Sequence, residues 1–260
     1  MENSNSPQKY LSFIATNAAT AQLASPALTI AEEGELQIKY APFDHVTPNA
    51  RLVIVGITPG AAQATAALKA SRAAIVAGAD LRDALARAKS HASFSGPMRA
   101  NLVAMLDAIG VAEYFGLSSS AQLFEAGSEQ VHFTSALRYP VFRQGKNYNG
   151  TPNMLKTPML RQMIDTYLAE EARQLPQALW LPLGPKAGEA LQHLVRRGLL
   201  KEDRVLAGMP HPSGANAERV AVFLGRKSPQ AASRQTNGAT LCAAFKRLET
   251  QMSELKGGAQ

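Results

Sequence analysis

The pattern of apolar and polar residues predicts short buried strands that alternate with helices. Four apolar runs rich in β-branched or large side chains are expected to be strands, at residues 52–55, 131–133, 178–183 and 204–207. Gly, Pro, Ser or Thr follows each run, and then a segment of helical periodicity, which is typical of parallel strands joined by crossover helices. We therefore expect an α/β fold, a three-layer α/β/α sandwich around a central, mainly parallel four-stranded sheet.

Apolar residues spaced by three and four predict the helices, whose bounds are uncertain by a few residues. They are expected at residues 61–77, 81–90, 97–109, 155–171, 186–195 and 240–255. The last of these carries one apolar stripe, which we interpret as a face that docks on the core. Two stretches rich in Gly, Asn, Pro and Ser, residues 142–157 and 227–238, are expected to be loops.

Length and composition indicate one globular domain over residues 1–260, ending in a helix at 239–256. The chain has 260 residues and 46% hydrophobic content, enough for one sizeable core. Residues 1–30 form a possible N-terminal extension, either a frayed arm or a helix packed on the outside. Neither a signal peptide nor a long apolar run is visible, so we expect a cytoplasmic protein without membrane association.

Charge and cysteine content narrow the classes of partner and cofactor. The excess of 27 Lys and Arg over 20 Asp and Glu gives a formal charge of +7, which favours a polyanionic partner. A single cysteine, Cys242, excludes a disulfide framework and any iron–sulfur cluster held by several thiolates. We expect no metal and no cofactor.

Sheet topology selects the candidate site before any motif is compared. In an open parallel sheet, ligands bind beyond the C-terminal ends of the strands, where loops and helix N-termini converge. Four segments occupy these positions in the predicted fold. They are Gly56 to Gly60, Thr134 to Pro140, Gly184 to Ala187 and Pro210 to Asn216.

The order of motifs in these segments resembles the uracil-DNA glycosylase superfamily. The Gly56-Ile57-Thr58-Pro59-Gly60 turn is similar to the Gly-Ile-Asn-Pro-Gly turn of the mismatch-specific branch, and His211-Pro212-Ser213 is similar to the family's His-Pro-Ser loop. Leu183-Gly184 followed by Ala187 matches an element between them. The resemblance runs from about residue 40 to residue 226 and implies a protein that holds a base flipped out of DNA and cuts its N-glycosidic bond.

The resemblance assigns the catalytic roles to His211 and Thr58. His211 would donate a hydrogen bond to the base oxygen as negative charge accumulates there, held between Pro210 and Pro212; the alternative is a histidine that only caps its own turn. Thr58 stands where the family has Asp or Asn to position water. Because threonine supplies neither a base nor a negative charge, either cleavage is impaired or another residue, such as Asp44, substitutes.

The substrate-binding roles implied by the resemblance depart from the family pattern in one further place. Ser135 replaces the asparagine that reads the base edge, so either Asn147, Asn149 or Asn153 takes over this role or the preferred base is not uracil. Phe94 is expected to stack on the base, although a core position is an alternative. The remaining substrate-binding residues are expected to be Gly56, Ile57, Pro59, Gly60, Ser213 and Asn216.

The expected partner is DNA, with single strands or weakly paired duplexes favoured. Small residues follow His211 at the position where some relatives insert a bulky apolar wedge into the base stack. Phosphate contacts are expected from Arg138, Arg143, Lys146 and Arg219. Two other functions stay open: a binding module of this fold that has lost cleavage, and an enzyme that acts on a free nucleoside or another small molecule.

Overall fold

The computed structural model describes residues 6–18, 23–92, 97–125 and 128–257. The chain forms two compact units, each assembled from three separate stretches of sequence. Unit 1 consists of Met1–Pro48, Gly56–Ser93 and Phe133–Gln174, and unit 2 of Asn49–Val55, Phe94–His132 and Leu175–Gln260. The boundary between the units runs through two strands. The expectation of a single domain over residues 1–260 stays a prediction.

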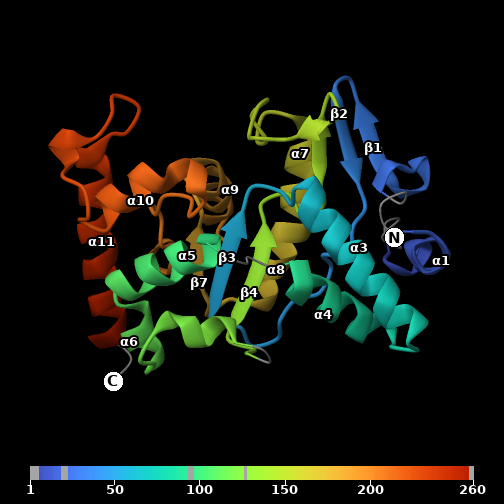
Figure 1. Cartoon of the computed structure of the whole chain (residues 1–260), viewed down its shortest axis with the longest axis horizontal. Helices are drawn as coiled ribbons and strands as arrows, with labels where there is room; N and C mark the ends of the chain where they lie inside the picture. Colours follow the sequence, from blue (N-terminus) through green and yellow to red (C-terminus); the bar gives the residue numbers. More distant parts are fainter. Residues whose placement is uncertain (1–5, 19–22, 93–96, 126–127, 258–260) are drawn as a thin grey trace. The chain divides into compact units, whose positions relative to one another are not determined.

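The central sheet has three strands, in the order β4-β3-β7. They are β3 (Leu52–Gly56), β4 (Val131–Ser135) and β7 (Leu179–Pro182), and Figure 1 shows β3 and β4 side by side. Strands β3 and β7 run parallel, with Leu52 opposite Leu179 and Val55 opposite Pro182. Residues 52–55 and 179–182 are buried throughout, which explains why these strands are apolar runs without alternation. The predicted α/β fold with a central parallel sheet is confirmed.

The predicted fourth strand, at residues 204–207, is wrong. This segment forms one isolated parallel bridge, between Val205 and Trp180. The Leu206 N–H also donates to the Trp180 carbonyl oxygen at 2.8 Å. A short 3-10 turn (Glu202–Arg204) precedes the bridge, and Gly208 at φ 115° follows it, so the extended run is too short for a ladder. Val205 and Leu206 of this segment are buried, but the central sheet has three strands.

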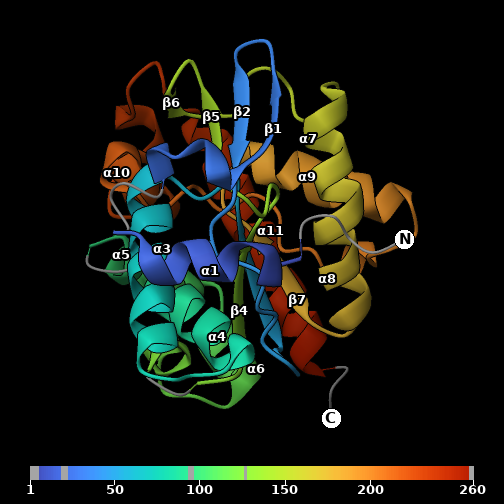
Figure 2. The same ribbon diagram turned by 90° about the vertical axis from the view of Figure 1, so that its right-hand side faces the viewer.

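A second, antiparallel sheet belongs to unit 1 and was not predicted. Figure 2 shows its strands next to one another, in the order β1-β2-β5-β6. They are β1 (Thr29–Glu33), β2 (Leu36–Lys39), β5 (Val141–Arg143) and β6 (Lys146–Asn147). The prediction of a loop over residues 142–157 is therefore wrong at its start. Gln144 and Gly145 both have positive φ, 51° and 72°, as the tight turn of a two-residue hairpin requires.

The helices of unit 1 include three that the periodicity predicts. Helices α3 (Ala61–Val76) and α4 (Leu81–Ala92) pack on each other. The third prediction corresponds to α7 (Pro158–Met163) and α8 (Ala169–Gln174), joined by a π-helical segment (Ile164–Leu168).

The N-terminal part of unit 1 is also helical. Helix α1 (Gln8–Thr16) buries Tyr10 and Ile14, and the Tyr10 ring stacks on Tyr40 with centroids 3.9 Å apart. Of the two alternatives for this region, a packed helix is therefore the one observed for residues 8–16.

The helices of unit 2 are α5 (Pro97–Ala108), α6 (Val111–Phe115), α9 (Pro185–Arg196), α10 (Ala217–Phe223) and α11 (Gly238–Gly257). Helix α11 uses the predicted apolar stripe: Leu248 and Met252 are buried, and the Phe245 ring meets Phe223 of α10 edge-on at 5.3 Å. Residues 227–237 are irregular apart from one 3-10 turn (Pro229–Ala231), and Gly238 of the predicted loop begins α11. Over the described ranges, no helix is long and apolar enough to cross a bilayer.

Candidate functional site

The predicted site residues fall into two groups, one in each compact unit, and each group is described by itself. Unit 1 contains Gly56, Ile57, Thr58, Pro59, Gly60, Ser135, Arg138, Arg143 and Lys146. Unit 2 contains His211, Ser213, Asn216 and Arg219. Phe94, predicted to stack on the base, lies outside the described residues.

The Gly56–Gly60 turn of unit 1 leads from β3 into α3 and is fixed to the end of β4. The Ala136 N–H donates to the Gly56 carbonyl oxygen at 2.8 Å, and the Leu137 N–H donates to that of Ile57 at 2.9 Å. A Cβ on Gly56 would lie 3.4 Å from the Ser135 Oγ. Ser135 thus lies directly beside the turn, so the structure brings together these two predicted parts of the site.

The Thr58 hydroxyl joins the turn to β5. It donates to the Tyr139 carbonyl oxygen at 3.0 Å and accepts from the Val141 N–H at 3.1 Å, on either side of Pro140. Its single proton is therefore used within the protein, and the oxygen keeps only an acceptor position. This geometry gives Thr58 a structural role that the sequence did not suggest. A catalytic role of Thr58 stays a prediction.

Asn147, one of three candidates to replace the base-reading asparagine, lies against the same turn. Its Oδ1 accepts from the Ala61 N–H at 3.0 Å, and its Nδ2 lies 3.2 Å from the position that a Cβ on Gly60 would occupy. Asn147 is exposed, and its amide N–H₂ stands at the N-terminus of α3. Asn153 instead accepts from Leu155 and Lys156 in its own turn, so the contacts favour Asn147.

A buried tyrosine cluster in unit 1 holds the carboxylate of Asp44. The Tyr40 hydroxyl donates to Oδ2 at 3.0 Å, and the Tyr139 hydroxyl donates to Oδ1. Burial raises the pKa of Asp44, while the hydrogen bonds from Tyr139 and Tyr40 and the nearby positive charges of Arg138 and Lys89 oppose this shift. Asp44 is surrounded by protein but only half-buried by surface area, so part of it reaches solvent.

The backbone on both sides of Asp44 is fixed by a buried lysine. The Lys89 ammonium donates to the Phe43 carbonyl oxygen at 3.2 Å and to that of His45 at 2.6 Å. Burial lowers the pKa of Lys89 to about 8. Lys89 lies on α4, so this helix sets the position of the segment that carries Asp44.

Arg138, predicted to contact phosphate, is paired inside unit 1. Its Nη2 lies 2.6 Å from Oε1 of the fully buried Glu171, and its Nε donates to the same oxygen at 3.0 Å. The side chain is only 11% exposed, and the guanidinium packs 4.8 Å from the centre of the Tyr167 ring. The structure thus gives Arg138 an internal charge partner, and its contact with DNA stays a prediction.

His211 in unit 2 is oriented by its own loop. The Ser213 N–H donates to Nδ1 at 3.2 Å, so the neutral ring carries its proton on Nε2. Burial lowers the pKa of His211, which favours this neutral form. The loop is anchored by α5, because the Asn101 amide donates to the Pro212 carbonyl oxygen at 2.9 Å. The imidazole therefore offers a neutral N–H donor, as the proposed contact with a base oxygen requires.

Two glycines shape the backbone around the His211 loop. Gly208 has φ 115°, and a Cβ there would lie 2.8 Å from Arg247 and 2.9 Å from Ala244 of α11. Gly184 has φ 89°, and its Cβ position lies 4.0 Å from the His211 Cβ. Positive φ makes both positions suited to glycine, and at Gly208 the lack of space adds to the restriction.

The remaining predicted residues are mostly at the surface. The Ser213 hydroxyl accepts from Asn216 at 3.0 Å, and Arg219 donates to the Asn216 Oδ1 at 2.7 Å. Arg143 pairs with Glu35 at 2.8 Å, with both side chains more than 40% exposed. Such exposed pairs are weak, so the Arg143 charge stays accessible. Lys146 is exposed on β6.

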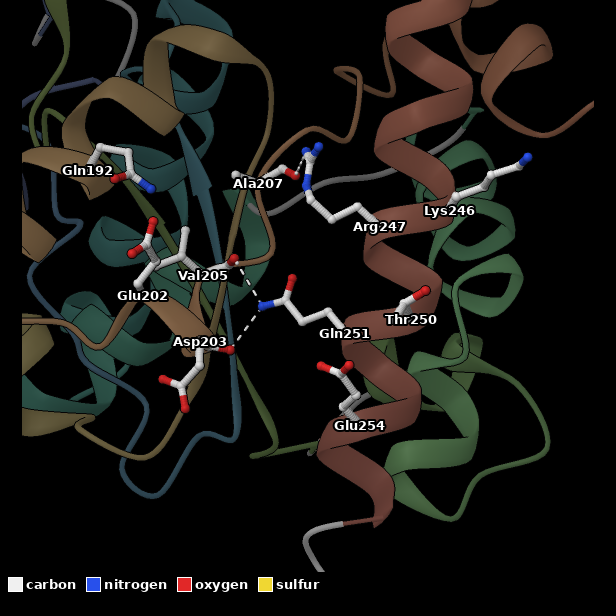
Figure 3. Close-up of a pocket in the computed structure, with 10 residues that line it drawn as sticks. All are labelled: Gln192, Glu202, Asp203, Val205, Ala207, Lys246, Arg247, Thr250, Gln251 and Glu254. Atoms are coloured by element: carbon white, nitrogen blue, oxygen red, sulfur yellow. Dashed lines mark hydrogen bonds between the residues drawn. The ribbon is translucent and has the colours of Figure 1, made fainter.

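A cavity of about 710 Å³ in unit 2, between α11 and the segment at 202–207, is lined by none of the predicted site residues. Figure 3 shows Gln251 donating to the carbonyl oxygens of Asp203 and Val205, at 2.9 and 3.3 Å. Arg247 donates to the Ala207 carbonyl oxygen at 3.0 Å. Val205 and Ala207 are alternate residues of the short extended run after the 3-10 turn, so their carbonyls lie on the same edge of it. The polar groups here satisfy that edge, so the cavity is not the candidate site.

The fold and these motifs define a glycosylase-like α/β protein, with a Gly-Pro turn after the first strand of the sheet and a proline-flanked histidine loop late in the chain. The chain belongs to the Uracil DNA glycosylase superfamily, whose family model matches residues 43–232. It is also similar to the "Uncharacterized protein YoxB" of Bacillus subtilis (strain 168), with 36% identity over 214 residues, covering 81% of this chain and 84% of the relative. No solved structure matches the chain.

The tyrosine cluster is the part of the candidate site that sequence reasoning missed. Tyr40 and Tyr139 are 99 residues apart in number, and no local pattern links either of them to Asp44. The signal that was available is Asp44 itself, an acidic residue among Ala41, Pro42 and Phe43. Within the described part of the chain, no group of three or more His, Cys, Asp or Glu side chains could hold a metal ion.

Proposed function

We propose that this protein is a monofunctional DNA glycosylase that binds a flipped-out, deaminated base and hydrolyses its N-glycosidic bond in base-excision repair. The observation that carries the proposal is the orientation of His211, whose Nδ1 accepts from Ser213 and leaves the Nε2–H as the donor. The superfamily match, which spans this loop and the Thr58 turn, supports it. DNA is the proposed partner and the cytoplasm the proposed location.

The chemistry requires stabilisation of two opposite charges. As the C1′–N bond breaks, the sugar becomes positive and the base becomes negative. A neutral imidazole N–H aimed at a base oxygen stabilises the negative charge of the departing base by a hydrogen bond. The imidazole does not need to be protonated for this role. The backbone of Gly56 to Gly60 and the side chains of Ser135 and Asn147 are proposed to bind the base, since all of them belong to the turn region of unit 1.

The residues after His211 support a proposed preference for the kind of DNA strand. Gly214 and Ala215 are exposed and small, so this loop offers no bulky wedge to separate a stable pair. We propose that single-stranded DNA and weakened pairs are the preferred substrates. Arg143, Lys146 and Arg219 are exposed and are proposed to contact phosphates, with Arg138 as a further candidate despite its pairing with Glu171.

The test is a cleavage assay with matched histidine variants. Labelled oligonucleotides containing uracil, hypoxanthine or xanthine, in single and double strands, are incubated with the protein, and abasic sites are then nicked. We expect product from at least one base, a loss of about 10²-fold or more for His211→Ala, and no loss for His91→Ala, which changes an exposed histidine on α4. No product from the whole panel, or equal rates for both variants, would contradict the proposal.

One observation favours a second function, a binding module that has lost cleavage. Both Thr58 hydroxyl contacts are internal, and Ser135 lacks the paired donor and acceptor of an amide. This alternative predicts DNA binding that weakens steeply with salt, without turnover. Free nucleosides, included in the same assay, test the third possibility of a small-molecule enzyme. Product from nucleosides but not from oligonucleotides would favour it.

A further inference from the structure

We propose that Asp44 supplies the negative charge that the Thr58 turn lacks, and that its carboxylate stabilises the sugar cation and accepts the proton of the attacking water. This inference rests on the proposed function. It assigns the charge to a residue on a different segment from the turn, the loop after β2. The geometry around Asp44 carries the assignment in three steps.

The first step is that Asp44 has acceptor capacity left. Each carboxylate oxygen accepts one tyrosine hydroxyl, Oδ2 from Tyr40 and Oδ1 from Tyr139. An ionised carboxylate has about four acceptor positions, so roughly two remain. Asp44 as a whole residue is half-buried.

The second step is that its charge is not cancelled by a direct partner. Both hydrogen-bond donors are neutral hydroxyls. The nearby cations are engaged elsewhere: Arg138 pairs with Glu171 at 2.6 Å, and Lys89 donates to two carbonyl oxygens. The ionisable groups that surround the carboxylate in unit 1 come from α1, the loop after β2, α4, the segment after β4, the π-helical segment and α8. They are Tyr10, Tyr40, Lys89, Arg138, Tyr139, Tyr167 and Glu171.

The third step is that Asp44 and the turn share one positioning residue. The Tyr139 hydroxyl donates to Asp44, and the Tyr139 carbonyl oxygen accepts from the Thr58 hydroxyl. Lys89 fixes the carbonyls before and after Asp44. The carboxylate is therefore held in a defined position relative to the turn, as a preorganised charge must be.

The proposed step is a balanced hydrolysis. The oxygen of water forms a bond to C1′, and the C1′–N bond breaks with its electron pair leaving on the base. The proton of the water passes to the Asp44 carboxylate. Asp44 then releases its proton to solvent, and the departed base takes one up.

A purely structural role is the competing explanation, because two tyrosines and a half-buried acid also form a stable hydrogen-bonded core. Loss of activity alone would not separate the two. Binding of a stable cationic mimic of the transition state separates the catalytic role from the structural one. A carboxylate beside the sugar attracts positive charge at C1′ whether or not a bond is cut.

The experiment compares two single-stranded oligonucleotides that differ at one position, a cationic pyrrolidine abasic analogue and a neutral tetrahydrofuran analogue. We expect the wild-type protein to bind the pyrrolidine form about tenfold or more tightly. Asp44→Asn should lose this preference while keeping its affinity for the tetrahydrofuran form. Glu33→Gln, which removes an exposed carboxylate from β1 of the same unit, should keep the preference.

Equal or undetectable binding of the two analogues by the wild-type protein, or a preference unchanged in Asp44→Asn, would overturn the inference. The outcome is separate from that of the proposed function. An Asp44-dependent preference without cleavage of any tested base contradicts the proposed hydrolysis but supports the role of Asp44. Cleavage of a tested base without a preference for the cationic analogue supports the proposed hydrolysis but contradicts the role of Asp44.

Discussion

Replacement of Thr58 by valine removes the hydroxyl that joins the Gly56–Gly60 turn to β5 while nearly keeping the shape of the side chain. Two hydrogen bonds are lost, one to the Tyr139 carbonyl oxygen and one from the Val141 N–H. Each contributes about 1 kcal/mol net, and a buried N–H left without a partner costs about 1 to 3 kcal/mol. Val141 is fully buried, so its N–H has little access to water. We expect Thr58→Val to lose about 2 to 4 kcal/mol of unfolding free energy.

The assay is urea unfolding followed by far-ultraviolet circular dichroism, with Thr58→Ser as the matched control. Serine keeps the hydroxyl, so we expect it to lose less than about 1 kcal/mol at an unchanged m-value. Thr58→Val should also bind DNA and cut it less well, because β5 and the turn are no longer held together. A loss below about 0.5 kcal/mol for Thr58→Val, or equal losses for both variants, would refute the role of the hydroxyl as a structural link.

Three further predictions test other contacts. Glu171→Gln should destabilise the fold by about 3 to 5 kcal/mol, because it leaves the Arg138 charge buried without its partner. Urea unfolding midpoints measure this loss of stability, and a loss under about 1 kcal/mol argues against the prediction. Because the pKa of Lys89 is lowered, this residue binds fewer protons in the folded than in the unfolded chain between pH about 8 and 10.5. The unfolding free energy of the wild-type protein relative to Lys89→Met should therefore rise with pH across that window, by on the order of 3 kcal/mol. A difference that stays flat or falls contradicts the lowered pKa. Gly208→Ala should lower the melting temperature more than Gly214→Ala, because an added Cβ at Gly208 meets α11 while at Gly214 it meets open space; equal shifts would show that the space at Gly208 is not limiting.

The sequence predicts β3 and β7 of the central sheet well because these two strands are short, apolar and buried. The side chains of residues 52–55 and 179–182 are apolar apart from the indole N–H of Trp180. The segment at 204–207 is also apolar after Arg204 but forms only the bridge at Val205. The apolar composition of a segment indicates that it is buried, whereas a β-ladder also requires an extended run of sufficient length. Strands β5 and β6 were missed because they have three and two residues, and the pairing of β5 with β2 is non-local.

The candidate site was predictable where the chain itself brings residues together. The turn at Gly56–Gly60 and the loop at His211 are continuous motifs, and the neighbouring position of Ser135 follows from sheet topology. The contacts of Tyr40 and Tyr139 with Asp44 and the position of Asn147 on the turn depend on tertiary packing. No residue spacing encodes them. The pairing of Arg138 with Glu171 is of the same kind, since a surface arginine and a buried one look alike in sequence.

The side chains of Arg247 and Gln251 have a consequence for solubility. They occupy carbonyl groups at Val205 and Ala207 that a foreign strand would otherwise use for pairing. A chain cut before Gly238 would lose this cover together with the apolar contacts of α11. Such a truncation should associate with other copies of itself through the uncovered backbone, rather than merely unfold at lower temperature.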